Sequence, residues 1–105
     1  MGDEAAFRKV AGKELESLSS KLDGFTELTV DYASEILNIE FDDGDKFVAN
    51  LQGPTQQIWF AARYQAGHFA WDDAAKDWLD SKTKETLRAR VARDVGFKLK
   101  RDIKL

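Results

Sequence analysis

The chain has 105 residues, of which 43% are hydrophobic and 33% charged, and its formal net charge is −3. This length and composition are typical of one soluble globular domain with a single core, so we expect residues 1–105 to form one domain. Because the chain has no cysteine, it cannot form disulfides or zinc–thiolate sites, use a thiol nucleophile, or ligate an iron–sulfur cluster through thiolates.

Charge is distributed unevenly along the chain. Residues 1–45 carry 12 acidic and 4 basic side chains, whereas residues 82–105 carry 3 acidic and 9 basic ones. This asymmetry predicts an acidic and a basic surface region. Either the two regions face solvent independently, or they orient the protein on a partner with complementary charge.

The first predicted element is an amphipathic helix over residues 4–22. Its apolar residues recur at spacings of three and four, which is the pattern of one buried helix face. They are Phe7, Val10, Ala11, Leu15, Leu18 and Leu22.

Period-two alternation predicts five or six short strands in the middle of the chain. The segments are "ELTVDYAS", "EILNIEF", "KFVANLQ", "QIWFAA", "GHFAW" and a short "DWLD". Asp43-Gly44 lies between the second and the third segment and is a strong hairpin signal, because this kind of turn needs a positive φ.

The final helix is predicted over about residues 82–95, with Leu87, Val91 and Val95 at spacing four. Gly96 is expected to end it. Residues 97–105 are basic, but they contain four apolar side chains, so we expect this tail to pack near the helices rather than to be free. These side chains are Phe97, Leu99, Ile103 and Leu105.

This order of elements predicts an α+β fold, a two-layer α-β sandwich in which two terminal helices pack on one face of a five- to six-stranded antiparallel sheet. The other face is then open to solvent. In "QIWFAA", the apolar set of Ile58, Phe60 and Ala62 must face the helices, and in "KFVANLQ" the inner set is Phe47, Ala49 and Leu51. The outward residues of the neighbouring strands are Asn50, Gln52, Gln57, Trp59 and His68.

A tryptophan among amides on an open face has two interpretations. Trp59 is either a protein-binding hot spot, where truncation costs about 2 kcal/mol or more, or a ring that lies flat and half-covered by its neighbours. The amides on either side of Trp59 favour the binding interpretation.

Other functional classes are disfavoured. One histidine, no cysteine and no Gly-x-Ser-x-Gly elbow leave no nucleophile–base pair, and no glycine-rich phosphate loop is present, so we predict that the chain is not an enzyme. Only Phe97 is interleaved with the basic residues of 82–105, so binding of RNA or other nucleic acid ranks below docking on an acidic protein surface. No run of about 18 apolar residues is present to span a membrane. The charged N-terminus is unlike a signal or transit peptide.

Carboxylates recur at a spacing of four from the end of the first predicted helix into the first strand. They are Asp23, Glu27, Asp31 and Glu35. Exposed carboxylates along one edge bind divalent cations weakly. A charged edge that discourages pairing with other chains is an equally good explanation.

The segment "NLQGPTQQIWFAA", followed by "GHFAW" and "DWLD", resembles the signature of the frataxin family, Asn-(Lys/Arg)-Gln-x-Pro-x-x-Gln-(Ile/Val)-Trp-Leu. The resemblance extends over nearly the whole chain, from an acidic first helix to the closing helix. It implies a non-enzymatic protein of iron–sulfur cluster assembly. Members of the family bind the complex of cysteine desulfurase and its scaffold protein, modulate sulfur transfer, and bind Fe²⁺ or Fe³⁺ weakly through surface carboxylates.

The resemblance also implies which residues carry these functions. The partner-binding sheet surface of the family corresponds here to Asn50, Gln52, Gln57 and Trp59, with His68 at a position where bacterial members often have histidine. The acidic ridge that binds iron corresponds to Asp23, Glu27 and Asp31, with Glu14 and Glu16 as nearby candidates. An alternative function is that of an iron donor or buffer acting mainly through its carboxylates. We expect a monomer, in the cytoplasm of a bacterium or in the mitochondrial matrix of a eukaryote after removal of a targeting segment.

Departures of the chain from the family pattern bear on both the partner surface and the ridge. Leu51 stands where the motif has a basic residue, so we expect one cationic contact to the partner to be missing. Ser19, Ser20 and Gly24 stand where many members have acids, which thins the ridge and predicts weaker or relocated iron binding.

Overall fold

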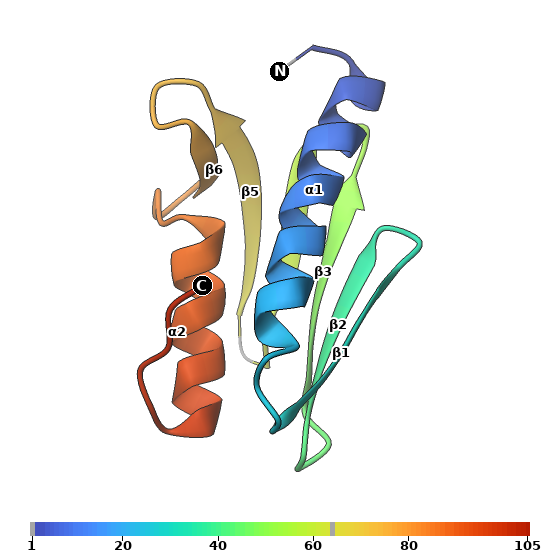
Figure 1. Cartoon of the computed structure of the whole chain (residues 1–105). Coiled ribbons are helices and arrows are strands. Elements are labelled where there is room, and N and C mark those ends of the chain that lie inside the picture. Colours follow the sequence, from blue (N-terminus) through green and yellow to red (C-terminus); the bar gives the residue numbers. More distant parts are fainter. Residues whose placement is uncertain (1, 64) are drawn as a thin grey trace.

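Two helices lie side by side on one face of a six-stranded antiparallel sheet in the computed structural model, which describes residues 2–63 and 65–105 (Figure 1). In chain order the elements are α1 (Glu4–Leu22), β1 (Leu28–Ala33), β2 (Ile36–Phe41), β3 (Lys46–Gln52), β4 (Gln57–Ala61), β5 (Ala66–Asp72), β6 (Asp77–Asp80) and α2 (Leu87–Leu99). The strands neighbour one another in sequence order, so the predicted two-layer α-β sandwich is confirmed. No helix within the described ranges is long and apolar enough to cross a membrane.

Helix α1 begins where predicted because Asp3 caps it: its carboxylate accepts a hydrogen bond from the backbone N–H of Ala6 at 2.9 Å. The buried face of α1 consists of Phe7, Ala11, Leu15, Leu18 and Leu22. Val10 is 38% exposed, so its assignment to this face is wrong. Successive residues of a helix are about 100° apart, so Val10 lies at the rim of a stripe that is centred on its neighbour Ala11.

The sheet has one face toward the helices and one toward solvent. Inward residues of β2, β3 and β4 are buried and alternate with half-buried or exposed residues, as predicted. On the covered face Phe47 and Phe60 pack edge to face, with ring centroids 5.9 Å apart. Gly44 adopts a φ of 91° in the turn between β2 and β3, which confirms the hairpin signal.

Helix α2 begins five residues later than predicted, at Leu87. The chain before it forms a turn around the buried carboxylate of Asp80, which accepts hydrogen bonds from the backbone N–H groups of Lys82 at 2.7 Å and Thr83 at 3.0 Å. Thr86 then caps the helix by accepting from the N–H of Ala89 at 3.1 Å. Residues 82–86, which the sequence analysis included in the helix, therefore precede it, and the Asp80 side chain stabilises the turn that they begin.

Helix α2 also continues past Gly96. The prediction that Gly96 ends the helix is therefore wrong. Lys100, with a φ of 61°, takes the left-handed position that ends the helix. Gly96 instead permits close packing, because a Cβ at this position would lie 2.7 Å from the carbonyl oxygen of Arg101.

The chain turns back after α2 and runs alongside this helix (Figure 1). Leu99, Ile103 and Leu105 are partly buried and pack against the core. Phe97 is 82% exposed, so the expectation that it packs with the tail is wrong. It follows the buried Val95 by two residues, which places it about 200° around the helix, on the side away from the core.

A buried arginine holds α2 against the sheet. Arg90 is 4% exposed, and its Nε donates to Asp94 Oδ2 at 2.6 Å while its Nη2 donates to the carbonyl oxygen of Gln65 at 3.1 Å. Its guanidinium lies over the ring of Phe60, 5.3 Å from the centroid. Phe60 is the β4 neighbour of Trp59. The Arg90 cluster therefore packs against the covered side of the strand that carries Trp59.

Candidate functional site

Trp59 lies in the middle of the open sheet face. The register places it opposite Asn50 on β3 and opposite His68 on β5. Gln52 and Gln57 face each other in the next outward pair of β3 and β4. The structure thus brings together all the residues predicted for partner binding, and we call this set the Trp59 face: Asn50, Gln52, Gln57, Trp59 and His68.

Trp59 is half-buried, and its neighbours decide which parts of it are free. Its ring stacks on the imidazole of His68, with centroids 4.5 Å apart and planes inclined by 18°. The indole N–H donates to Gln57 Oε1 at 2.9 Å. The ring is therefore half-covered by its neighbours, and because part of it stays uncovered, this geometry agrees with both interpretations of Trp59. It leaves apolar ring surface, rather than a hydrogen-bond donor, for a partner to contact.

The amides beside Trp59 are available to another molecule. Asn50 and Gln52 are half-buried, and their side chains form no hydrogen bond with any residue that the structure describes. Each amide keeps two N–H donors and a carbonyl acceptor, and leaving such groups without partners after burial is costly. A partner that covers this face must therefore supply matching hydrogen bonds, which makes the amides a source of specificity.

Leu51 faces the core and not the Trp59 face. It is 7% exposed, and the register pairs it with the buried Ile58. Because side chains alternate along a strand, the residue between Asn50 and Gln52 must point toward the helices. Leu51 is therefore not part of the Trp59 face, and the expected loss of a cationic contact to the partner stays a prediction.

The carboxylates predicted to bind iron do not lie together: some lie near β1, and Glu14 lies on the side of α1 that faces α2. Asp23 follows α1 and Asp31 lies on β1; both are exposed and have no side-chain partner among the described residues. Glu14 faces α2, where its two oxygens accept hydrogen bonds from Arg88 at 2.9 and 3.0 Å. Within residues 2–63 and 65–105, no group of three or more histidine or acidic side chains is arranged to hold a metal ion.

The other two candidates lie on the β1 side and differ in availability. Arg101 donates from both terminal nitrogens to the carboxylate of Glu27, with 3.2 Å between Nη2 and Oε1. This hydrogen bonding holds the pKa of Glu27 below its ordinary value. Glu16 is exposed, and with Glu35 it adds to the effect of burial in raising the pKa of Tyr32. The candidates without a cationic partner in the described part of the chain are Asp23, Asp31 and Glu16.

The acidic and basic regions of the sequence neutralise each other across the fold. Ion pairs join residues that are 53 to 74 positions apart. Neither of the two interpretations of the charge asymmetry included this internal pairing, which draws the basic end of the chain onto the acidic first half. The pairs are Arg88 with Glu14, Lys98 with Asp43 and Asp45, and Arg101 with Glu27.

Two outward apolar residues beside the Trp59 face were not singled out from the sequence. Ile36 of β2 is 40% exposed and lies opposite Asn50. Val48 of β3 is half-buried and lies opposite Ala61 of β4. The alternation in "EILNIEF" contained the signal for Ile36, because an inward Leu37 requires its neighbour to face outward.

Comparison with known proteins finds that the chain is similar to frataxin-like proteins. A family model described as a frataxin-like domain matches residues 1–101. The iron-sulfur cluster assembly protein CyaY of Thioalkalivibrio sulfidiphilus is 36% identical over 87 residues, covering 80% of this chain and 81% of the relative. The frataxin structure from Psychromonas ingrahamii matches with a TM-score of 0.88 at 17% identity, covering 98% of this chain and 97% of that one. A trimeric frataxin from Saccharomyces cerevisiae, complexed with ferrous iron, has a TM-score of 0.68 at 18% identity, covering 96% and 89%.

Proposed function

The chain belongs to the frataxin family, and on this premise we propose that it is a non-enzymatic iron–sulfur cluster assembly factor. It binds the complex of a cysteine desulfurase and its scaffold protein and modulates sulfur transfer between them. The name of the relative from Thioalkalivibrio sulfidiphilus supports the assembly role. That relative is bacterial, which favours the cytoplasm as the place of action.

The observation that carries the proposal is the arrangement around Trp59. The face combines apolar ring surface with the amides of Asn50 and Gln52, which have no partner among the described residues. An apolar centre flanked by directional donors and acceptors is the usual composition of a protein-binding hot spot. This composition fits a protein partner better than a small substrate, which binds in a concave pocket.

Binding of the unmodified chain to a reconstituted desulfurase–scaffold complex tests the proposal. We expect saturable binding in biolayer interferometry, together with a change in the rate at which the desulfurase releases sulfide from cysteine. Absence of both effects would rule the proposal out. Light scattering on the same samples reports the oligomeric state, for which we propose a monomer even though the yeast frataxin is trimeric.

Weak binding of iron as a cargo is the second part of the proposal. The exposed Asp23, Asp31 and Glu16 offer hard oxygen ligands without a preformed cage, which favours low affinity. The yeast frataxin complexed with ferrous iron supports this part. Because Glu14 and Glu27 are already engaged by arginines, we favour the assembly role over the alternative of an iron donor or buffer.

Neutralising the ridge with Asp23→Asn, Glu27→Gln and Asp31→Asn together is expected to weaken Fe²⁺ binding about fivefold or more, because each carboxylate contributes to the local charge density. Anaerobic calorimetric titration of Fe²⁺ into both proteins measures the change. Equal affinities would mean that these three residues are not the site.

Arg101→Gln is expected to have the opposite effect on iron. It releases Glu27 from its ion pair, so Fe²⁺ should bind about two- to fivefold more tightly, the scale of an exposed pair. Lys104→Gln removes the same charge from the same tail without touching Glu27 and serves as the matched control. An equal gain in both variants would indicate a general charge effect and not competition between Arg101 and iron.

A further inference from the structure

An uncharged band crosses the open sheet face from Trp59 to the β1 edge. The register places one residue of each strand from β1 to β5 in a single row: Ala33, Ile36, Asn50, Trp59 and His68. In the neighbouring row, Asn38, Val48, Ala61 and Ala66 stand beside one another on β2 to β5. None of these nine residues carries a formal charge when His68 is neutral, in a chain of which 33% is charged.

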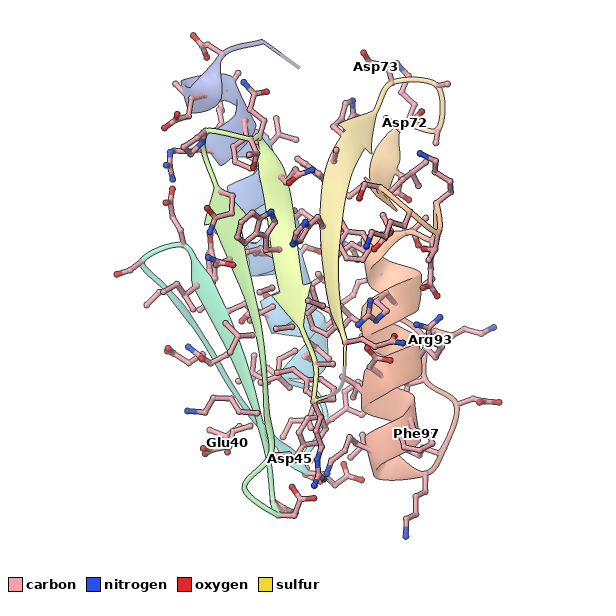
Figure 2. All side chains as sticks on the ribbon, turned by 180° about the vertical axis from the view of Figure 1, so that it is seen from behind. Glu40, Asp45, Asp72, Asp73, Arg93 and Phe97 are labelled. Atoms are coloured by element: carbon pink, nitrogen blue, oxygen red, sulfur yellow. The ribbon has the colours of Figure 1, made fainter. Side chains whose placement is uncertain are left out.

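Asp31 of β1 lies opposite Asn38 and ends the second row at the β1 edge with a charge. The other charges on the open face of the sheet lie toward its two ends. Glu40 of β2 and Lys46 of β3 form an outward pair beyond Val48, at the end of the sheet near Asp45. Asp72 and Asp73 lie at the opposite end (Figure 2). The uncharged band therefore occupies the middle of the face.

Ile36 is the largest exposed aliphatic side chain of the band, and its position is firmly fixed. It follows a turn in which Ser34 and Glu35 take left-handed φ values of 53° and 66°. The Glu35 side chain accepts a hydrogen bond from Arg8 of α1, and its carbonyl oxygen accepts one from the N–H of Leu51 at 3.3 Å. A side chain on such a fixed backbone loses little freedom on binding, so more of its contact energy is available to a partner.

Exposure of one apolar side chain is ordinary on protein surfaces and by itself indicates nothing. Val10 of α1 is exposed to nearly the same degree, 38% against 40% for Ile36, but it lies on the opposite layer of the fold. What distinguishes Ile36 is continuity: Asn50 alone separates it from Trp59 across the strands.

We propose that Ile36 is a second apolar anchor of the docking face, in addition to Trp59. The occupant is an uncharged protein surface that places an apolar side chain over Asn50, between the two anchors. Strands two positions apart are separated by about 10 Å, which leaves room for one such side chain. Neighbouring backbone or amide groups of the partner pair with the free amide of Asn50. The inference rests on the function proposed above and specifies the kind of surface that the assembly partner presents.

The absence of charge in the band determines this choice of occupant. A nucleic acid would need cations against its phosphates. A charged protein surface would lose hydration against the row that joins Ile36 to Trp59 without gaining a counter-charge there, because Asp31 lies only in the neighbouring row, at the β1 edge. An apolar surface with amide or backbone groups needs no cations from the band and has no charge whose hydration would be lost.

Ile36→Thr, which keeps a β-branched side chain suited to a strand, tests the inference with Val10→Thr as the matched control. We expect the first variant to bind the desulfurase–scaffold complex about five- to tenfold more weakly and the control to bind within about twofold of the unmodified chain. The ratio should be the same at roughly 50 and roughly 300 mM NaCl, because no charge is involved. Circular dichroism establishes that both variants are folded. If Ile36→Thr does not fold, Ile36→Val replaces it, with a smaller loss expected in the same direction.

Three outcomes would overturn the inference. Equal binding by the Ile36 and Val10 variants would remove Ile36 from the interface, while the proposed function would still be decided by binding of the unmodified chain. A loss that disappears at high salt would mean a charged occupant. A change in self-association alone, seen by sedimentation, would mean that a second copy of the chain covers the band.

Discussion

Removal of residues 97–105 is expected to lower the melting temperature by roughly 10–20 °C. The segment contributes Leu99, Ile103 and Leu105, which are partly buried and pack against the core. Complete burial of a large apolar side chain contributes about 1.5–3 kcal/mol, so three partly buried ones contribute about 2–4 kcal/mol together. For a domain of this size each kcal/mol corresponds to roughly 4–8 °C. Differential scanning calorimetry of the shortened and the full chain measures the difference.

Phe97→Ala is the control for this truncation. Phe97 belongs to the removed segment but is 82% exposed, so its replacement should shift the melting temperature by no more than about 2 °C. A full-size shift from Phe97→Ala alone would mean that Phe97, and not the three partly buried side chains, provides the stabilisation. If the truncated chain melts at the temperature of the full chain, the tail does not pack against the core.

Trp59→Ala is expected to weaken binding to the desulfurase–scaffold complex about thirtyfold or more, which corresponds to about 2 kcal/mol. The variant removes the ring surface at the centre of the Trp59 face and leaves Gln57 without its intrachain donor. The fold should persist, because Trp59 is only half-buried and lies on the solvent side of the sheet. Biolayer interferometry on the immobilised complex gives the dissociation constants.

Trp71→Ala is the matched control, because Trp71 is also half-buried and its indole N–H also donates to a nearby side chain, Asp73 Oδ1 at 2.9 Å. Trp71 packs against Trp78 beneath the sheet, with ring centroids 5.6 Å apart. Its replacement should lower stability but leave binding by the folded protein unchanged. Equal losses of binding in the two variants would point to a folding defect rather than to the Trp59 face.

Local sequence rules were sufficient to predict which way the central strands face. Alternation in "QIWFAA" and "KFVANLQ" placed Trp59 outward and Leu51 inward, and both placements are confirmed. The family pattern suggests a lost cationic contact at Leu51, which stays a prediction, whereas the alternation predicted the side of the sheet on which Leu51 lies. A strand residue cannot change its side without changing the side of every neighbour, which makes this rule robust.

Tertiary interactions explain where the sequence prediction failed. Helix α2 starts late because Asp80 binds the backbone of the preceding turn, and the side chain of a single aspartate carries no periodic signal. The pairing of Arg101 with Glu27 joins positions 74 residues apart, so nothing local to either residue predicts that this ridge carboxylate is engaged. The availability of the iron-binding candidates therefore had to come from the structure.

Mapping the contact surface by nuclear magnetic resonance tests the central claim most directly. The isotope-labelled chain is titrated with the unlabelled desulfurase–scaffold complex, and amide and indole N–H signals are followed. We predict that the Trp59 indole signal and the backbone signals of Asn50, His68 and Ile36 shift or broaden first. Perturbations confined to α1 and β1, with the Trp59 indole signal unchanged, would contradict the assignment of the open sheet face as the docking surface.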